Sequence, residues 1–137
     1  MLKYQVVKIK NPIDKSEAFH ARLVPVTPIG LDEICQNISH QSTMTAHDVK
    51  AVLSSLEEQV FCILRNGGSV RMGDLGSFHP TLTSTGTSDA SLFTTSHIKS
   101  VMVRFTPSSR MHFELSKTNP AVVFMNATVK PAEDTVV

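Results

Sequence analysis

Long apolar runs are absent from this sequence of 137 residues. No segment approaches the roughly 18 consecutive apolar residues that a membrane-spanning helix needs, and Met1 to Gln5 lack the apolar core of a secretory signal. Cysteine is also scarce, because Cys35 and Cys62 are too few for a disulfide framework and both fall in apolar helical stripes, where we expect buried thiols. These absences predict a soluble, cytoplasmic protein without a membrane partner.

A large excess of one charge sign is missing as well. The chain has 13 Lys and Arg against 12 Asp and Glu, a net charge of +1, which excludes a strongly cationic surface over the whole protein. Charge is nevertheless segregated along the chain: residues 1–22 sum to +3, residues 23–64 to −4 and residues 99–117 to +3. A local basic surface is therefore compatible with the composition.

The sequence also lacks the spacings that carry catalysis or metal binding. Its six histidines show no H-x-x-x-H pattern, its two cysteines no C-x-x-C pattern, and each cysteine is predicted to be too buried to act as a nucleophile. The glycines at 67, 68, 73 and 76 do not form a phosphate-binding loop, because no lysine follows them in the required context. We expect a protein that is no enzyme and has no cofactor, metal or small-molecule substrate.

Enough apolar residues remain for one folded core. They make up 41% of the chain against 18% charged residues, which lies outside the composition of disordered chains. Residues 4–10 and 18–26 are rich in strand formers, and the turn at Asn11-Pro12 separates them. They are expected to pair as an N-terminal β-hairpin.

Two helices are predicted after this hairpin. Apolar residues recur at helical spacing over residues 31–39 and again over residues 49–64. Thr45 stands three residues before Asp48, a variant of the capping box, so the second helix is expected to begin there. Asn66-Gly67-Gly68 supplies residues that tolerate a left-handed stop.

Strand patterns dominate the rest of the chain. Residues 69–72 and 77–82 flank a glycine-rich turn and predict a hairpin, and residues 98–105 predict a further strand. Residues 83–97 are polar and predict a mobile loop or an exposed ribbon. Residues 108–115 fit a short helix or a strand, with the helix favoured, residues 121–125 fit a strand, and residues 130–137 look like a frayed tail.

The order of these elements over residues 29–116 resembles the HU/IHF family of bacterial nucleoid DNA-binding proteins. The family's Gly-Phe-Gly-x-Phe turn is similar to Asp74-Leu75-Gly76-Ser77-Phe78, with aspartate in place of the first glycine, and its Phe-Lys-Pro is similar to Phe105-Thr106-Pro107. The resemblance implies an α+β fold in which the helices of two chains intertwine as a homodimer and an antiparallel sheet carries arms that embrace double-stranded DNA in its minor groove. We expect an HU-like domain at residues 29–117, preceded by the extra β-hairpin of residues 1–28 and followed by a C-terminal extension at residues 118–137.

The predicted arm departs from that family. The family's arm is basic and carries Arg-Asn-Pro, whose proline wedges between base pairs, whereas residues 83–97 contain no lysine, arginine or proline. Leu92 and Phe93 are the apolar residues available as wedges, and the alternative is that they pack on their own ribbon. Phosphate contacts must therefore come from other basic residues. The candidate DNA-binding residues are Arg71, Lys99, Arg104, Arg110 and Lys117.

Each of these cations also fits an ordinary solvated strand or helix face. Lys3, Lys8 and Lys10 either extend the basic surface or protect an edge strand from pairing with other chains. Two functions follow as hypotheses: an architectural, nucleoid-associated homodimer that binds DNA through its backbone without sequence specificity, or a protein-interaction module that retains the fold without strong DNA binding. In a monomer, the N-terminal hairpin would have to cover the apolar faces of the helices.

Overall fold

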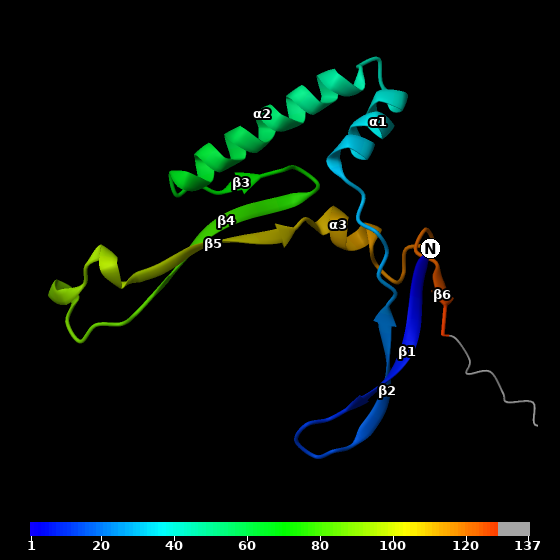
Figure 1. Cartoon of the computed structure of the whole chain (residues 1–137), viewed down its shortest axis with the longest axis horizontal. Coiled ribbons are helices and arrows are strands. Elements are labelled where there is room, and N and C mark those ends of the chain that lie inside the picture. The colour runs from blue at the N-terminus through cyan, green and yellow to red at the C-terminus, as the bar shows by residue number, and fades with distance from the viewer. Residues whose placement is uncertain (129–137) are drawn as a thin grey trace, which may run out of the picture. The chain divides into compact units, whose positions relative to one another are not determined.

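The computed structural model describes residues 1–128 of the chain. Contacts divide the chain into two compact units (Figure 1). Residues 29–113 form one of them, which we call the helix–sheet unit. Residues 1–28 join with residues from Glu114 onward to form the other, which we call the terminal unit. The predicted tail at residues 130–137 lies outside the described residues.

Two helices open the helix–sheet unit. Helix α1 spans Leu31–Gln41 and helix α2 spans Ala46–Arg65. The predicted capping box is confirmed: the Asp48 amide donates to the Thr45 hydroxyl at 3.2 Å, and that hydroxyl donates to the Asp48 carboxylate at 2.7 Å. These hydrogen bonds hold the pKa of Asp48 below its usual range. Asn66 caps the C-terminal end of α2, and Gly67 follows with a φ of 79°. This is the left-handed conformation that the Asn66-Gly67-Gly68 sequence predicts at the end of the helix.

A salt bridge ties the two helices together. The ammonium group of Lys50 on α2 donates to the carboxylate of Asp32 on α1 at 2.7 Å. The hydrogen bond and the charge of Lys50 together lower the pKa of Asp32, and they raise the pKa of Lys50 in turn. Apolar packing between the helices buries Cys35 and Val49. The prediction of a second buried thiol is wrong, because Cys62 is exposed on α2.

A three-stranded antiparallel sheet follows the helices. Strands β3 (Val70–Arg71), β4 (Gly76–Ser84) and β5 (Ile98–Pro107) lie in the order β3-β4-β5. The turn between β3 and β4 requires glycine at its end: Gly76 has a φ of 149°, and a Cβ there would meet the Thr106 carbonyl oxygen and lie 2.8 Å from the Phe105 ring. Gly76 thus sets the close approach of β4 to β5. Helix α3 (Ser109–Glu114) comes directly after β5, so the favoured helix at residues 108–115 is confirmed.

The two faces of this sheet differ in chemistry. Directly opposed residues share a face, so Phe78 and Phe105 lie on the same side, with Pro80 opposite Val103 farther along. The Phe78 and Phe105 rings lie 5.1 Å apart. Helix α2 runs along this apolar face (Figure 1), and Phe61 and Leu64 line cavities together with Pro80, Phe78 and Val103. The other face of the sheet therefore points away from α2.

Beyond the end of α2, β4 and β5 continue as a ribbon that ends in a loop (Figure 1). Two 3-10 turns, Ala90–Leu92 and Thr95–His97, structure the loop predicted at residues 83–97. Thr94 donates its backbone N–H to the His97 ring at 3.1 Å, and the Phe93 and His97 rings lie 5.3 Å apart. Short local hydrogen bonds thus organise a segment that has too few apolar residues for a core.

The terminal unit is a second three-stranded sheet in the order β2-β1-β6. Strands β1 (Leu2–Lys10) and β2 (Glu17–Leu23) pair antiparallel, as the predicted hairpin requires, with Tyr4 opposite Leu23. Strand β6 (Phe124–Asn126) pairs parallel with β1, and Leu2 lies opposite Phe124. The predicted hairpin thus gains a third strand from the C-terminal segment. This strand overlaps the one predicted at residues 121–125, but it begins at Phe124 and ends at Asn126. No helix among residues 1–128 is long and apolar enough to cross a bilayer.

Candidate nucleic-acid interface

The face of the β3-β4-β5 sheet that points away from α2 is polar. Arg71 on β3 lies opposite Ser77 on β4, and His79 on β4 lies opposite Arg104 on β5. Because the side chains of a strand alternate between its two faces, these four residues share one side of the sheet. Hydroxyl side chains occupy most of the remaining positions on that side: Thr81, Thr83, Ser100 and Thr106. The arrangement offers cations and hydrogen-bond donors with little apolar surface.

Acidic residues are missing from these strands. Strands β3, β4 and β5 carry Arg71, Lys99 and Arg104 and no aspartate or glutamate. Within residues 1–128, no carboxylate lies within 4.0 Å of a charged nitrogen of these three side chains, and all three are exposed. The acids of the helix–sheet unit lie instead on the two helices, at the β3–β4 turn and in the ribbon loop. Cations on the sheet are thus available to an anionic ligand.

Lys99 occupies an irregular position in the ladder. Ser84 pairs with Ile98 and Thr83 pairs with Ser100, so Lys99 is the extra residue at a register shift. Such an insertion increases the local twist of a strand and re-aims a side chain. The shift lies at the base of the ribbon, where Thr83 and Ser100 also share a hydrogen bond of 2.6 Å between their hydroxyl oxygens.

Arg110 differs from the other predicted cations because it has an acidic partner. Its guanidinium donates to the Asp74 carboxylate at 2.9 Å, joining α3 to the β3–β4 turn. Ser108 supports the same junction, since its hydroxyl donates to the Asp74 carbonyl and its N–H to the Leu75 carbonyl at 3.2 Å. Arg110 fixes the turn, and its charge is partly neutralised before any ligand arrives.

Lys117 belongs to the other unit of the chain. It follows α3 in the terminal unit, where it is exposed and lines a cavity of about 520 Å³ with Tyr4, Leu23 and Phe124. Among the five predicted site residues, Arg71, Lys99 and Arg104 lie on one sheet, whereas Arg110 and Lys117 do not. The residues of the chain that the structure describes include no group of three or more side chains suited to hold a metal ion.

Comparisons with known proteins agree with this architecture. The family model described as an "HU domain fused to wHTH, Ig, or Glycine-rich motif" matches residues 1–121. The chain belongs to this HU-HIG family. No curated protein matches the chain.

One solved structure has the same fold as this HU-HIG chain. The crystal structure described as "a Putative bacterial DNA binding protein from Bacteroides vulgatus ATCC 8482" matches with a TM-score of 0.66 and 16% sequence identity over 95% of this chain. The chain spans about half the length of that protein, since the match covers 50% of it. The match includes the terminal unit as well as the helix–sheet unit.

The ribbon of this HU domain places the predicted wedge residues at different positions. Leu92 is 59% exposed at the end of the first 3-10 turn, whereas Phe93 stacks on His97. Leu92 is thus the more accessible of the two side chains at the ribbon loop. No cation accompanies it, because residues 83–97 contain none.

His79 is the residue of the polar face that the sequence analysis missed as part of an interface. The spacing of the histidines predicts no metal site and gives His79 no other role, yet His79 lies directly opposite Arg104 on the neighbouring strand. The alternation of polar and apolar residues in β4 and β5 indicates which residues of each strand share a face. Placing His79 beside Arg104 also requires the register between the two strands. Once β4 and β5 are aligned, His79 falls on the polar side by the same alternation that puts Phe78 and Pro80 on the apolar side.

Proposed function

We propose that this HU-HIG protein binds double-stranded DNA through the phosphate backbone, using the sheet face that points away from α2. The observation that carries the proposal is that Arg71 and Arg104 share this face, that Lys99 lies at the register shift beside it, and that none of the three has an acidic partner within residues 1–128, while β3, β4 and β5 contain no aspartate or glutamate. Hydroxyl side chains beside them supply neutral donors to phosphate oxygens. Such contacts position DNA without reading its bases, so binding is expected to have little sequence specificity.

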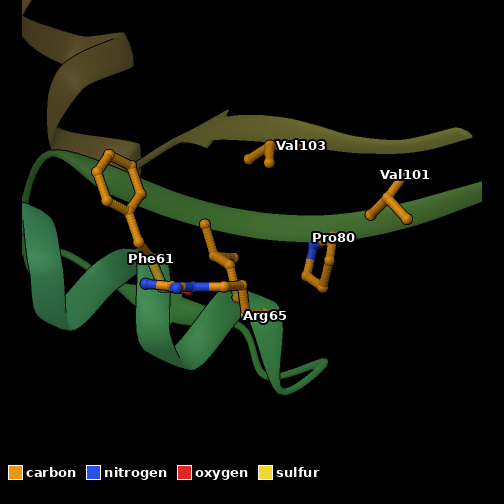
Figure 2. A pocket seen from close by; sticks show the side chains of 6 residues that line it. Phe61, Arg65, Pro80, Val101 and Val103 are labelled. Atoms are coloured by element: carbon orange, nitrogen blue, oxygen red, sulfur yellow. The ribbon is translucent and has the colours of Figure 1, made fainter.

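Dimerisation is part of the same proposal. Among residues 29–113, large apolar side chains stay open to solvent on the inner surfaces: Phe61 on α2 is 51% exposed and Val103 on β5 is 55% exposed. Cavities of about 500 and 420 Å³ lie between α2 and the sheet, and Phe61, Leu64 and Val103 line both. Figure 2 shows the larger one. A second copy of the chain that fills these cavities would bury this surface, as in the intertwined dimers of the HU/IHF family.

A dimer brings the cationic faces of two sheets together. Arg71, Lys99 and Arg104 then supply six phosphate contacts in all, enough for binding that weakens steeply as salt rises. Contacts from two sheets to one duplex allow the protein to constrain the path of the DNA. We therefore propose an architectural, non-catalytic role at the nucleoid.

The test is a titration of the full chain against a labelled duplex of about 30 base pairs at low and at moderate salt, with the oligomeric state measured by sedimentation. The proposal requires a dimer and an association constant that falls with salt by several units of logarithmic slope. Absence of binding at low salt would overturn it. Phe61→Asp, which places a carboxylate in both cavities, should convert the dimer to monomer.

A protein-interaction module is the second candidate. The net charge of +1 and the uncharged ribbon favour it, because both reduce the attraction for DNA relative to a basic-armed HU protein. The same titration separates the two functions. A dimer that binds no DNA at low salt would leave this second candidate as the better account.

A further inference from the structure

A row of side chains crosses the polar face of the sheet at the level of His79. Arg104 on β5 lies directly opposite His79 on one side. On the other side, the His79 ring Nδ1 lies 3.1 Å from the hydroxyl oxygen of Ser69, which immediately precedes β3. Arg71 is the next residue of β3 on the same face, one diagonal step away. His79 thus stands between the two arginines that the proposed function assigns to phosphate binding.

The His79 ring is half-buried, and its two nitrogens have different surroundings. Nδ1 is engaged by the Ser69 hydroxyl, which fixes the orientation of the ring. Nε2 is the nitrogen left to meet a ligand. A neutral imidazole offers one donor in total, whereas the protonated ring offers a donor at both nitrogens and a positive charge.

The charged groups that face His79 are cationic. Arg104 approaches from β5 and Arg71 from β3, while α2 packs against the opposite face of the sheet. Within residues 1–128, no carboxylate lies within 4.0 Å of the His79 ring. Asp74, in the turn between β3 and β4, is held by Arg110. A proton on His79 therefore has no internal anion to pair with, and a bound phosphate would supply one.

We infer that His79, lying between Arg71 and Arg104, is a further, proton-linked phosphate contact, so that DNA binding takes up protons and strengthens as the pH falls through the range in which histidine titrates. The inference rests on the proposed function, because it names a further residue and a regulation of the same face. Histidine is the side chain whose charge changes near neutral pH, so the effect is sought by comparing pH 8 with pH 5.5. The phosphate stabilises the imidazolium, and the imidazolium stabilises the bound phosphate, by linkage.

The experiment measures DNA affinity and its salt slope for the full chain at pH 8 and at pH 5.5. Each protonated His79 adds one phosphate contact, so the logarithmic salt slope should be steeper at pH 5.5 by about 0.9 per chain, or about 1.8 for a dimer. Calorimetric titration in buffers with different ionisation enthalpies should show uptake of up to about two protons per dimer at intermediate pH. The carboxyls of Asp14, Asp32 and Asp48, whose pKa values are lowered, stay ionised across this range.

Three variants separate His79 from the other histidines and from a structural role. His79→Gln keeps a donor next to Ser69 but cannot titrate, so it should bind DNA with the same salt slope at both pH values. His79→Lys carries a permanent charge and should show the steep slope at both. His97→Gln, in the ribbon loop, is the matched control and should keep the pH dependence of the unmodified chain.

The outcomes distinguish this inference from the function on which it rests. If the unmodified chain binds no DNA at either pH, the proposed function fails. If it binds with the same salt slope at both pH values, or if His79→Gln keeps the full pH dependence, only the role of His79 is refuted. A thermal melt of each variant without DNA identifies one that fails to fold, and His79→Lys then decides whether a fixed charge at this position replaces the proton.

Discussion

Replacing Arg104 by glutamine offers the sharpest test of the cationic sheet face. Arg104 is exposed, has no acidic partner within residues 1–128, and lies on β5 opposite His79. At pH 8, six contacts per dimer from Arg71, Lys99 and Arg104 predict a logarithmic salt slope of about 5.4. Removal of Arg104 from both chains leaves four contacts and a slope of about 3.6.

The difference is large enough to measure by fluorescence anisotropy with a labelled duplex. Between 50 and 200 mM salt, a slope of about 5.4 reduces the association constant roughly 1,800-fold, whereas a slope of about 3.6 reduces it roughly 150-fold. Several duplex sequences should lose affinity alike, because a phosphate contact carries no base preference. The stability of the free protein should change by less than about 0.5 kcal/mol, as for other exposed substitutions.

Lys50→Gln is the matched control for Arg104→Gln. It removes the same charge, but from α2, where Lys50 is paired with Asp32. We expect Lys50→Gln to leave the salt slope unchanged. An Arg104→Gln protein with the original slope, or a Lys50→Gln protein with an equal loss, would refute the assignment of the interface to this face of the sheet.

Three further predictions concern the β3–β4 turn, the junction between Arg110 and Asp74, and the N-terminal cap of α2. Gly76→Ala should lower the free energy of unfolding by about 2–4 kcal/mol in a denaturant titration, because its Cβ would collide with Thr106 and Phe105, whereas Gly86→Ala, with nothing within 4 Å, should have little effect. Arg110→Gln should reduce the DNA salt slope by less than Arg104→Gln does, because Arg110 is paired with Asp74; equal slopes for the two arginine variants would contradict this role of the ion pair. Because hydrogen bonds from Thr45 lower the pKa of Asp48 in the folded state, its stabilising effect is complete above the ordinary value of 3.8 and is lost as the pH falls through the lower folded value. Thermal melts in acidic buffers should therefore show less acid destabilisation for Asp48→Asn than for the unmodified chain.

The helices and the strand boundaries could be predicted because their signals are local. The capping pair Thr45 and Asp48 marks the start of α2, and Gly67 marks its end, within a few residues of the elements they limit. The β3–β4 hairpin could also be predicted, because a glycine-rich turn separates two short segments of strand formers. Arg71 and Arg104 were candidates because they are basic residues on predicted strands, but only the register shows that they share a face.

Features that depend on contacts between distant residues could not be predicted. Strand β6 has three residues, and its pairing with β1 leaves no periodic pattern in the sequence. The ion pair of Arg110 with Asp74 joins residues 36 positions apart, so Arg110 looked as free as Arg104. Cys62 lies in an apolar stripe that predicts burial, but burial there requires a covering surface that residues 1–128 do not supply.

The parallel pairing of β1 with β6 has a consequence for synthesis of the chain. Leu2 leaves the ribosome early, and its partner Phe124 is made more than a hundred residues later. Among residues 1–128, every strand of the β3-β4-β5 sheet lies within residues 29–113, so this sheet can pair before Phe124 has been made. A nascent chain stopped shortly after Phe113 should therefore protect β4 and β5 from protease and leave one side of β1 without its neighbour.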